Sequence, residues 1–168
     1  MNKKRIRLIT EGAAIAALYA VLTVATWEFS SLAIQCRLSE GLCVLCAFTP
    51  AAVPGLFVGC LISNIFGGQV LDMVFGSLAT LIAAAITRKM KGMSKWLLPL
   101  PTIVVNAIVI PFVLVYGYGV DSIANVTGTG AVLALTALSI AIGEALACYV
   151  VGMPLYEGLK KVKLFNED

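Results

Sequence analysis

The chain has 168 residues, of which 60% are hydrophobic and 12% are charged, and its mean hydropathy is +0.98. About 25% of the residues of a soluble domain are charged, so this composition excludes a soluble fold and predicts an all-α integral membrane protein. The sequence has no histidine, which removes the commonest metal ligand and the usual neutral-pH base. We therefore expect no metal, no cofactor and no catalytic residue.

Basic residues mark the expected orientation. All of the 12 lysines and arginines except Arg37 fall in three clusters. The clusters are Lys3, Lys4, Arg5 and Arg7; Arg88, Lys89, Lys91 and Lys95; and Lys160, Lys161 and Lys163. Such residues gather on the cytoplasmic side of membrane proteins, so both termini and the 88–95 loop are expected in the cytoplasm. The net charge of +3 is then an orientation signal and not a nucleic-acid footprint.

The apolar sequence divides into six predicted spans within a single membrane domain, residues 1–168. Their approximate bounds are 8–29, 38–49, 51–65, 70–87, 96–116 and 130–156. Pro50 and Pro54 separate the second span from the third, and Gly67-Gly68 precedes the fourth. Four spans before the 88–95 loop and two after it keep all three basic clusters on one side of the membrane.

Small residues recur along one face of the first span. They are Gly12, Ala13, Ala16, Ala17 and Ala20. Such stripes let helix backbones approach closely in lipid, so this stripe packs either against the chain's own helices or against a separate subunit.

Arg37 is the one basic residue outside the clusters, and it lies beside Gln35 and Glu40. The six-span arrangement places this segment at the outer surface. Glu144 is different, because it lies near the middle of the last apolar span, where a charge costs about 2.5–3.5 kcal/mol and marks a functional or paired site.

Glu144 has two interpretations from the residues alone: a ligand-facing carboxylate, or one half of a helix-to-helix pair with Arg37. Asn106, in the fifth span, either joins helices or faces the same pocket. Asn64 and Asp72 flank the outer turn between the third and fourth spans. Three aromatic residues near the outer level either form a membrane belt or stack against a flat ligand. They are Trp27, Phe29 and Tyr116.

Three stretches resemble the QueT family. They are Gln35-Cys36-Arg37-Leu38-Ser39-Glu40, the proline-containing stretch from Phe48 to Asn64, and Leu71 to Leu81. The ending from Gly143-Glu144 to Gly152-Met153-Pro154-Leu155 is similar too, so the resemblance covers nearly the whole chain.

The resemblance implies a six-helix substrate-binding (S) component of an energy-coupling factor (ECF) transporter in a prokaryotic plasma membrane. Such a subunit captures queuosine precursors outside the cell and docks on a transmembrane coupling protein and two ATPases. It also implies docking through Ala-x-x-x-Ala pairs, matched by Ala13 with Ala17 and Ala16 with Ala20. The sequence has no P-loop, consistent with ATP hydrolysis on another subunit.

The implied ligand is a deazaguanine base, which presents N–H donors and a carbonyl acceptor. Glu144 or Glu40 would accept from the donors, and Asn106, Gln35 or Arg37 would serve the carbonyl. Stacking would fall to Trp27, Phe29 or Tyr116. Asp72 would suit an aminomethyl cation on the ligand.

Other functions stay open from the sequence. The substrate could be another flat polar vitamin or nucleobase. A stand-alone secondary transporter usually has internal repeats, and no two halves of this chain match convincingly. An intramembrane enzyme would use Glu144 and Cys148, one helical turn apart, but the sequence offers no base to activate the thiol.

Overall fold

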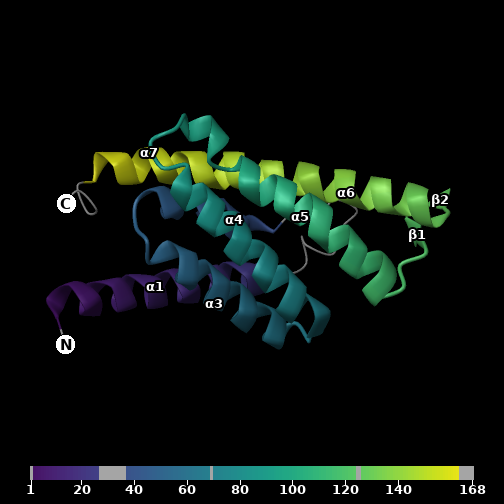
Figure 1. The fold of residues 1–168 in the computed structure, drawn as a ribbon, viewed down its shortest axis with the longest axis horizontal. Helices are drawn as coiled ribbons and strands as arrows, with labels where there is room; N and C mark the ends of the chain where they lie inside the picture. The colour runs from purple at the N-terminus through teal and green to yellow at the C-terminus, as the bar shows by residue number, and fades with distance from the viewer. Residues whose placement is uncertain (1, 27–36, 69, 124–125, 163–168) are drawn as a thin grey trace.

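Six helical segments run alternately between two ends of the molecule in the computed structural model, which describes residues 2–26, 37–68, 70–123 and 126–162 (Figure 1). Trp27, Phe29 and Gln35, which the sequence analysis singled out, lie outside these described residues.

The first half of the chain contains three segments. Helix α1 (Lys3–Ala25) begins at Asn2, whose side-chain oxygen accepts from the backbone N–H of Lys4 at 3.4 Å. A 3-10 helix, η1 (Leu38–Ala47), follows, and α3 (Ala52–Phe66) runs back beside α1. Pro50 lies between η1 and α3, and Pro54 lies in the first turn of α3, where a missing N–H costs no helical hydrogen bond.

The second half contains the other three segments. A π-helical turn, η2 (Asp72–Gly76), leads into α4 (Ser77–Lys89). The next segment consists of η3 (Lys95–Leu97), α5 (Leu100–Phe112) and the π-helical η4 (Val113–Gly117). The last consists of α6 (Thr129–Leu146), the π-helical η5 (Ala147–Gly152) and α7 (Met153–Lys161). Between the last two segments, β1 (Ser122–Ile123) pairs antiparallel with β2 (Val126–Thr127).

Three helices in the described residues are long and apolar enough to cross a membrane: Lys3–Ala25, Lys95–Gly117 and Thr129–Lys161. The apolar helices Leu38–Ala47 and Ala52–Phe66 are shorter. A ten-residue 3-10 helix is about 20 Å long, so η1 is shorter than the roughly 30 Å hydrocarbon core. Ser39 and Glu40, at its amino end, are buried inside the bundle.

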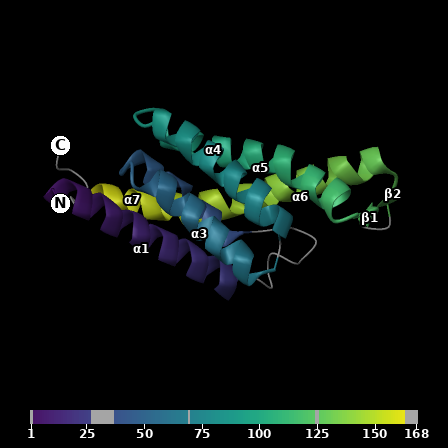
Figure 2. The same ribbon diagram turned by 60° about the horizontal axis from the view of Figure 1, so that its bottom comes forward.

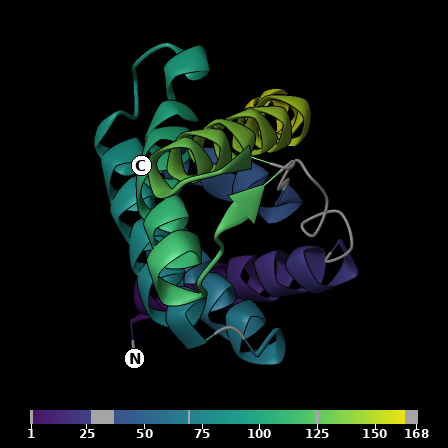
Figure 3. The same cartoon turned by 90° about the vertical axis from the view of Figure 1, so that its right-hand side faces the viewer.

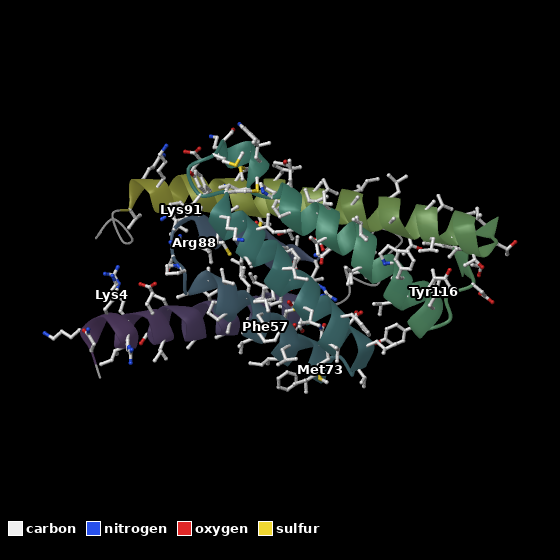
Figure 4. The ribbon with its side chains drawn as sticks, in the orientation of Figure 1. Lys4, Phe57, Met73, Arg88, Lys91 and Tyr116 are labelled. Atoms are coloured by element: carbon white, nitrogen blue, oxygen red, sulfur yellow. The ribbon has the colours of Figure 1, made fainter. Side chains whose placement is uncertain are left out.

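Both described chain ends lie at the same end of the molecule as the turn between α4 and η3 (Figures 1 and 2). Lys4, Arg88 and Lys91 lie in this half, whereas Met73 and Tyr116 lie toward the other end (Figure 4). The described residues of the three basic clusters thus lie in the same half of the molecule, a distribution that agrees with the positive-inside rule.

Glycines allow α1 and α3 to pack closely. A Cβ atom on Gly55 would lie 2.8 Å from the carbonyl oxygen of Gly12, and one on Gly59 would lie 2.8 Å from that of Ala16. Tyr19 and Leu56 are buried in the core that this contact closes.

The carboxyl end of η1 is held by a cation from a neighbouring helix. The guanidinium of Arg88 donates to the carbonyl oxygens of Cys46 and Ala47, at 3.0 and 3.2 Å. Because the last carbonyls of a helix have no partners within it, this contact satisfies them and fixes η1 against α4.

Candidate functional site

A cluster of buried polar side chains surrounds the amino end of η1. Viewed from the end that carries β1 and β2, η1 lies between α1 and the α6–α7 segment (Figure 3). Three carboxyl-bearing residues there are almost fully buried: Glu40 is 3% exposed, Asp72 4% and Glu144 4%. Buried charges are costly unless they are paired or hydrogen-bonded, so the partners of each carboxyl group decide what the cluster can do.

Glu40 is held from two sides. Its Oε1 accepts a hydrogen bond from the hydroxyl of Tyr19 in α1 and a longer one, 3.4 Å, from the hydroxyl of Thr80 in α4. The neighbouring Ser39 joins α1 as well, because the Thr23 hydroxyl donates to its oxygen at 2.7 Å. Glu40 therefore ties η1 to α1 and α4.

Two glycines bring η1 against η5. A Cβ atom on Gly41 would lie 2.8 Å from the Ala147 carbonyl oxygen, and one on Gly152 would lie 2.8 Å from the Gly41 carbonyl oxygen. At this crossing the thiol of Cys148 donates to the Glu40 carbonyl at 3.5 Å. Because η5 directly follows α6, this crossing places the backbone of Glu40 beside the carboxyl end of the helix that carries Glu144.

Glu144 is hydrogen-bonded to Asn106, and this bond joins the apolar helices α6 and α5. The Nδ2 of Asn106 in α5 donates to Oε1 of Glu144 in α6 at 2.9 Å. Its other oxygen, Oε2, is buried and has no hydrogen-bond partner in the described part of the chain. Glu144 thus offers one free acceptor position to a ligand.

Arg37 lies on the side of the polar cluster that faces η2. Its guanidinium is 3.7 Å from Oδ2 of Asp72, and its side chain is 19% exposed. The Nδ2 of Asn64 donates to the Asp72 backbone carbonyl at 2.8 Å. The Oδ1 atoms of Asn64 and Asp72 and the Ser77 hydroxyl oxygen are buried without a partner among the described residues.

The unpartnered atoms have a common chemistry. Three of the four are acceptors only, and the fourth is a hydroxyl oxygen that can also accept. Leaving a buried polar group unsatisfied costs about 1–3 kcal/mol. The site is therefore suited to a small molecule that presents several N–H or O–H donors.

The QueT transporter family model matches residues 9–161. The chain belongs to the QueT transporter family. No curated protein and no solved structure was found to match the chain.

Membership of the QueT family makes the chain a transporter protein, and its three long apolar helices agree with a location in a membrane. The polar cluster lies in the part of the chain that the family model covers. Its residues are therefore candidates for contacts with the transported substrate.

The structure brings together most of the site residues that the sequence pointed to. They are Arg37, Glu40, Asn64, Asp72, Asn106 and Glu144. The sequence analysis left open whether Glu144 faces a ligand or pairs with Arg37, and the structure shows no such pair. Arg37 is ion-paired with Asp72, and Glu144 is bonded to Asn106.

Tyr116 lies apart from the polar cluster. It is 67% exposed, stacks on Phe112 and lines a separate apolar groove with Leu71 and Phe75. Among the described aromatic residues, Tyr19 is the one whose hydroxyl reaches a site carboxylate.

Sequence reasoning missed Tyr19, Ser77 and Thr80. Each is almost fully buried, with 0%, 0% and 3% exposure. A signal existed for Tyr19, because it lies in the interior of the first span, away from the interfacial belt where tyrosine is usual. Ser77 and Thr80 carried no such signal, since small hydroxyl residues are common in membrane helices.

The small-residue stripe of α1 divides between two faces. Gly12 and Ala16 pack against α3, while Ala13 and Ala17 are exposed. Ala20 is half-buried. A groove of about 430 Å³ runs between α1 and α3, lined by Gly12, Ala13 and Ala16 on one side and by Pro50, Pro54 and Val58 on the other.

Proposed function

We propose that the chain is the S component of an ECF transporter that binds a deazaguanine-type queuosine precursor outside the cell. The observation that carries this proposal is the buried Glu144–Asn106 pair with its free Oε2 atom. In lipid an unsatisfied carboxylate oxygen is costly, so a ligand that supplies a donor there gains binding free energy.

The chemistry of a guanine-like edge suits this pair. Its adjacent N–H donors can approach Glu144, while its carbonyl needs a donor such as Arg37. Glu40 is a weaker candidate for direct contact, because Tyr19 and Thr80 already use its Oε1 atom. Stacking by Trp27 or Phe29 remains a proposal, as does a ligand contact of Gln35.

The orientation follows from charge. With both termini and the 88–95 loop in the cytoplasm of a prokaryotic cell, the amino end of η1 is approached from the outer side of the plasma membrane. Delivery then requires a separate transmembrane coupling protein and two ATPase subunits. The exposed Ala13 and Ala17 and the groove between α1 and α3 form the proposed docking face.

Ligand-dependent thermal stabilisation of the detergent-purified chain tests the proposal. A ligand that binds the folded state raises the unfolding temperature by mass action. We expect stabilisation by deazaguanines and not by vitamins that lack an adjacent pair of N–H donors. Stabilisation by an unrelated vitamin alone would reassign the substrate, and accumulation of substrate in liposomes by the isolated chain would indicate a stand-alone transporter instead.

A further inference from the structure

We propose that Tyr19 and Thr23 are positioning residues that couple the docking face of α1 to the ligand-binding end of η1. This inference rests on the proposed function, because it connects the proposed docking face to the proposed ligand site. Below, the hydrogen bonds from Tyr19 and Thr23 to η1 are called the α1–η1 link.

The α1–η1 link consists of two hydrogen bonds between side chains. The hydroxyl of Tyr19 donates to Oε1 of Glu40, and the hydroxyl of Thr23 donates to Oγ of Ser39 at 2.7 Å. Tyr19 and Thr23 are one helical turn apart on the same side of α1, and their acceptors are consecutive residues of η1. Two bonds with this spacing fix the position of η1 along α1 as well as its distance from α1.

Both bonds lie in the interior of the molecule. Tyr19 and Ser39 are 0% exposed, Thr23 is 1% exposed and Glu40 is 3% exposed. Bulk water therefore does not compete for these bonds, and breaking one of them leaves buried polar groups unsatisfied. A movement of α1 relative to η1 would break the bonds, so the two elements should move together in this region.

The proposed docking face lies on the same helix, directly before the link. Ala13 and Ala17 are exposed, whereas Tyr19 and Thr23 are buried. Tyr19 also packs tightly on α3, because a Cβ atom on Gly59 would lie 2.7 Å from the Cβ atom of Tyr19. A subunit that binds the exposed face and shifts α1 would therefore displace the link.

The first turn of η1 connects the link to the proposed ligand contacts. The backbone N–H of Glu40 donates to the carbonyl oxygen of Arg37 at 3.0 Å, and Arg37 is the proposed donor to the carbonyl group of the ligand. The thiol of Cys148, four residues after Glu144, donates to the carbonyl oxygen of Glu40 at 3.5 Å. A displacement of Glu40 therefore moves Arg37 relative to the ligand and changes the affinity for the ligand.

A connection of this kind acts in both directions. If docking changes the affinity for the ligand by some factor, the ligand must change the affinity for docking by the same factor. Such factors typically lie between about fivefold and about 150-fold. The α1–η1 link thus predicts a ligand effect on docking that depends on two buried hydroxyl groups.

The affinity of the purified full chain for its coupling module measures this factor. The module is the transmembrane coupling protein with its two ATPases, free of nucleotide, and it is titrated with the chain in nanodiscs with and without saturating deazaguanine. The ratio of the two dissociation constants is compared among the wild type, Tyr19→Phe, Thr23→Val and Ser39→Ala. Thermal unfolding and deazaguanine affinity of each variant are measured without the module.

Two matched controls lose a hydroxyl group outside the link. Tyr149→Phe removes the bond from Tyr149 to the carbonyl oxygen of Trp96, which also joins two segments of the bundle. Thr136→Val removes the bond from a buried threonine to the preceding turn of its own helix, α6. Both controls should keep the ratio of the wild type, whatever their effect on the unfolding temperature.

We expect the ligand to change the dissociation constant for docking at least about fivefold in the wild-type chain. Tyr19→Phe should bring this ratio to within about twofold of one, because it removes the stronger, charge-assisted bond of the link. Thr23→Val and Ser39→Ala should each reduce the ratio partly and to the same extent, because they remove the two sides of one neutral bond.

A wild-type ratio close to one, or a ratio that persists in all three variants, would overturn the inference and leave the α1–η1 link as a purely structural contact. If Tyr19→Phe does not fold, the ratios of Thr23→Val and Ser39→Ala decide the question. Failure of the wild-type chain to bind deazaguanine or the coupling module would overturn the proposed function, and the inference with it.

Discussion

At the scale of single residues, Glu144 differs from a carboxylate that only joins two helices. A joining carboxylate uses both oxygens or faces a cation, because an uncompensated buried charge is costly. Glu144 uses one oxygen for Asn106 and leaves the other free within the described residues. A substitution that removes only the free oxygen should therefore change ligand affinity without changing the stability of the fold.

We predict that Glu144→Gln weakens ligand binding by more than about tenfold. The glutamine oxygen can still accept from Asn106, but its NH₂ group replaces the free acceptor and repels a ligand donor. A lost charge-assisted hydrogen bond corresponds to about 1.5–3 kcal/mol. Calorimetry with the best deazaguanine measures the affinity, and thermal unfolding without ligand measures stability.

The Asp121→Asn variant is the control for loss of a carboxylate at an exposed position. Stability of Glu144→Gln without ligand should match that of the wild type. Unchanged affinity in this variant would show that Glu144 serves only to join α5 and α6.

The sequence predicted which residues belong to the polar cluster better than it predicted which of them bond to each other. Glu144 could be identified because it is a charged residue in an apolar span, and placing a charge in lipid costs free energy. Its partner could not be found this way, since Asn106 is 38 positions away and meets it only through the packing of α5 on α6. The same holds for Tyr19 and Glu40, 21 positions apart.

At the scale of elements, the small residues of α1 lie on two faces, one packed against α3 and one exposed. Their spacing in the sequence did not distinguish these two faces. Gly12 and Ala16 lie against α3, where a glycine partner lets the backbones touch. Ala13 and Ala17, one position further along, are exposed. A substitution on each face therefore tests a different function.

We predict that Ala17→Leu preserves ligand binding and abolishes uptake in cells that contain the coupling protein and ATPases. Ala16→Leu should instead destabilise the chain, because the larger side chain overpacks the contact with Gly59 by about 1–3 kcal/mol. Thermal unfolding, calorimetry and uptake are measured on both variants.

Ala134→Leu, at an exposed position of α6, is the matched control and should change none of the three measurements. Loss of ligand binding in Ala17→Leu would mean that this face supports the fold of the chain and is not a docking surface.

The local sequence predicted that a helix precedes Pro50 but not which type of helix it is. Pro50 and the apolar run before it indicate a short helix ending near this point, and η1 ends at Ala47. Nothing in that run distinguishes a 3-10 helix from an α-helix. In the structure, tertiary contacts hold both ends of this 3-10 helix. Arg88 bonds to the carbonyls of Cys46 and Ala47, and Tyr19 bonds to the side chain of Glu40.

At the scale of the whole molecule, the alternating path of the chain places its turns at two opposite ends (Figure 1). The turn between α4 and η3 lies at the end that holds both described chain ends, and the β1–β2 hairpin lies at the other (Figure 1). Gly68, Gly92 and Gly119 have positive φ angles of 67°, 93° and 70°, and a Cβ at any of them would meet no atom within 4 Å. Short insertions are therefore tolerated best at these turns.

We predict that an epitope tag inserted after Gly68 or Gly119 is detected on intact cells, whereas a tag after Gly92 or at the carboxyl terminus is detected only after permeabilisation. The six-span arrangement predicted from the sequence has four crossings before the 88–95 loop and two after it. On that arrangement, Gly68 and Gly119 face one side of the membrane, and Gly92 and the carboxyl terminus face the other. Ligand-dependent thermal stabilisation of each tagged chain serves as the control for a native fold. Tags at Gly68 and Gly92 on the same side would mean that α4 does not cross the membrane. A ligand would then have to reach the amino end of η1 and the carboxylates around it by another route.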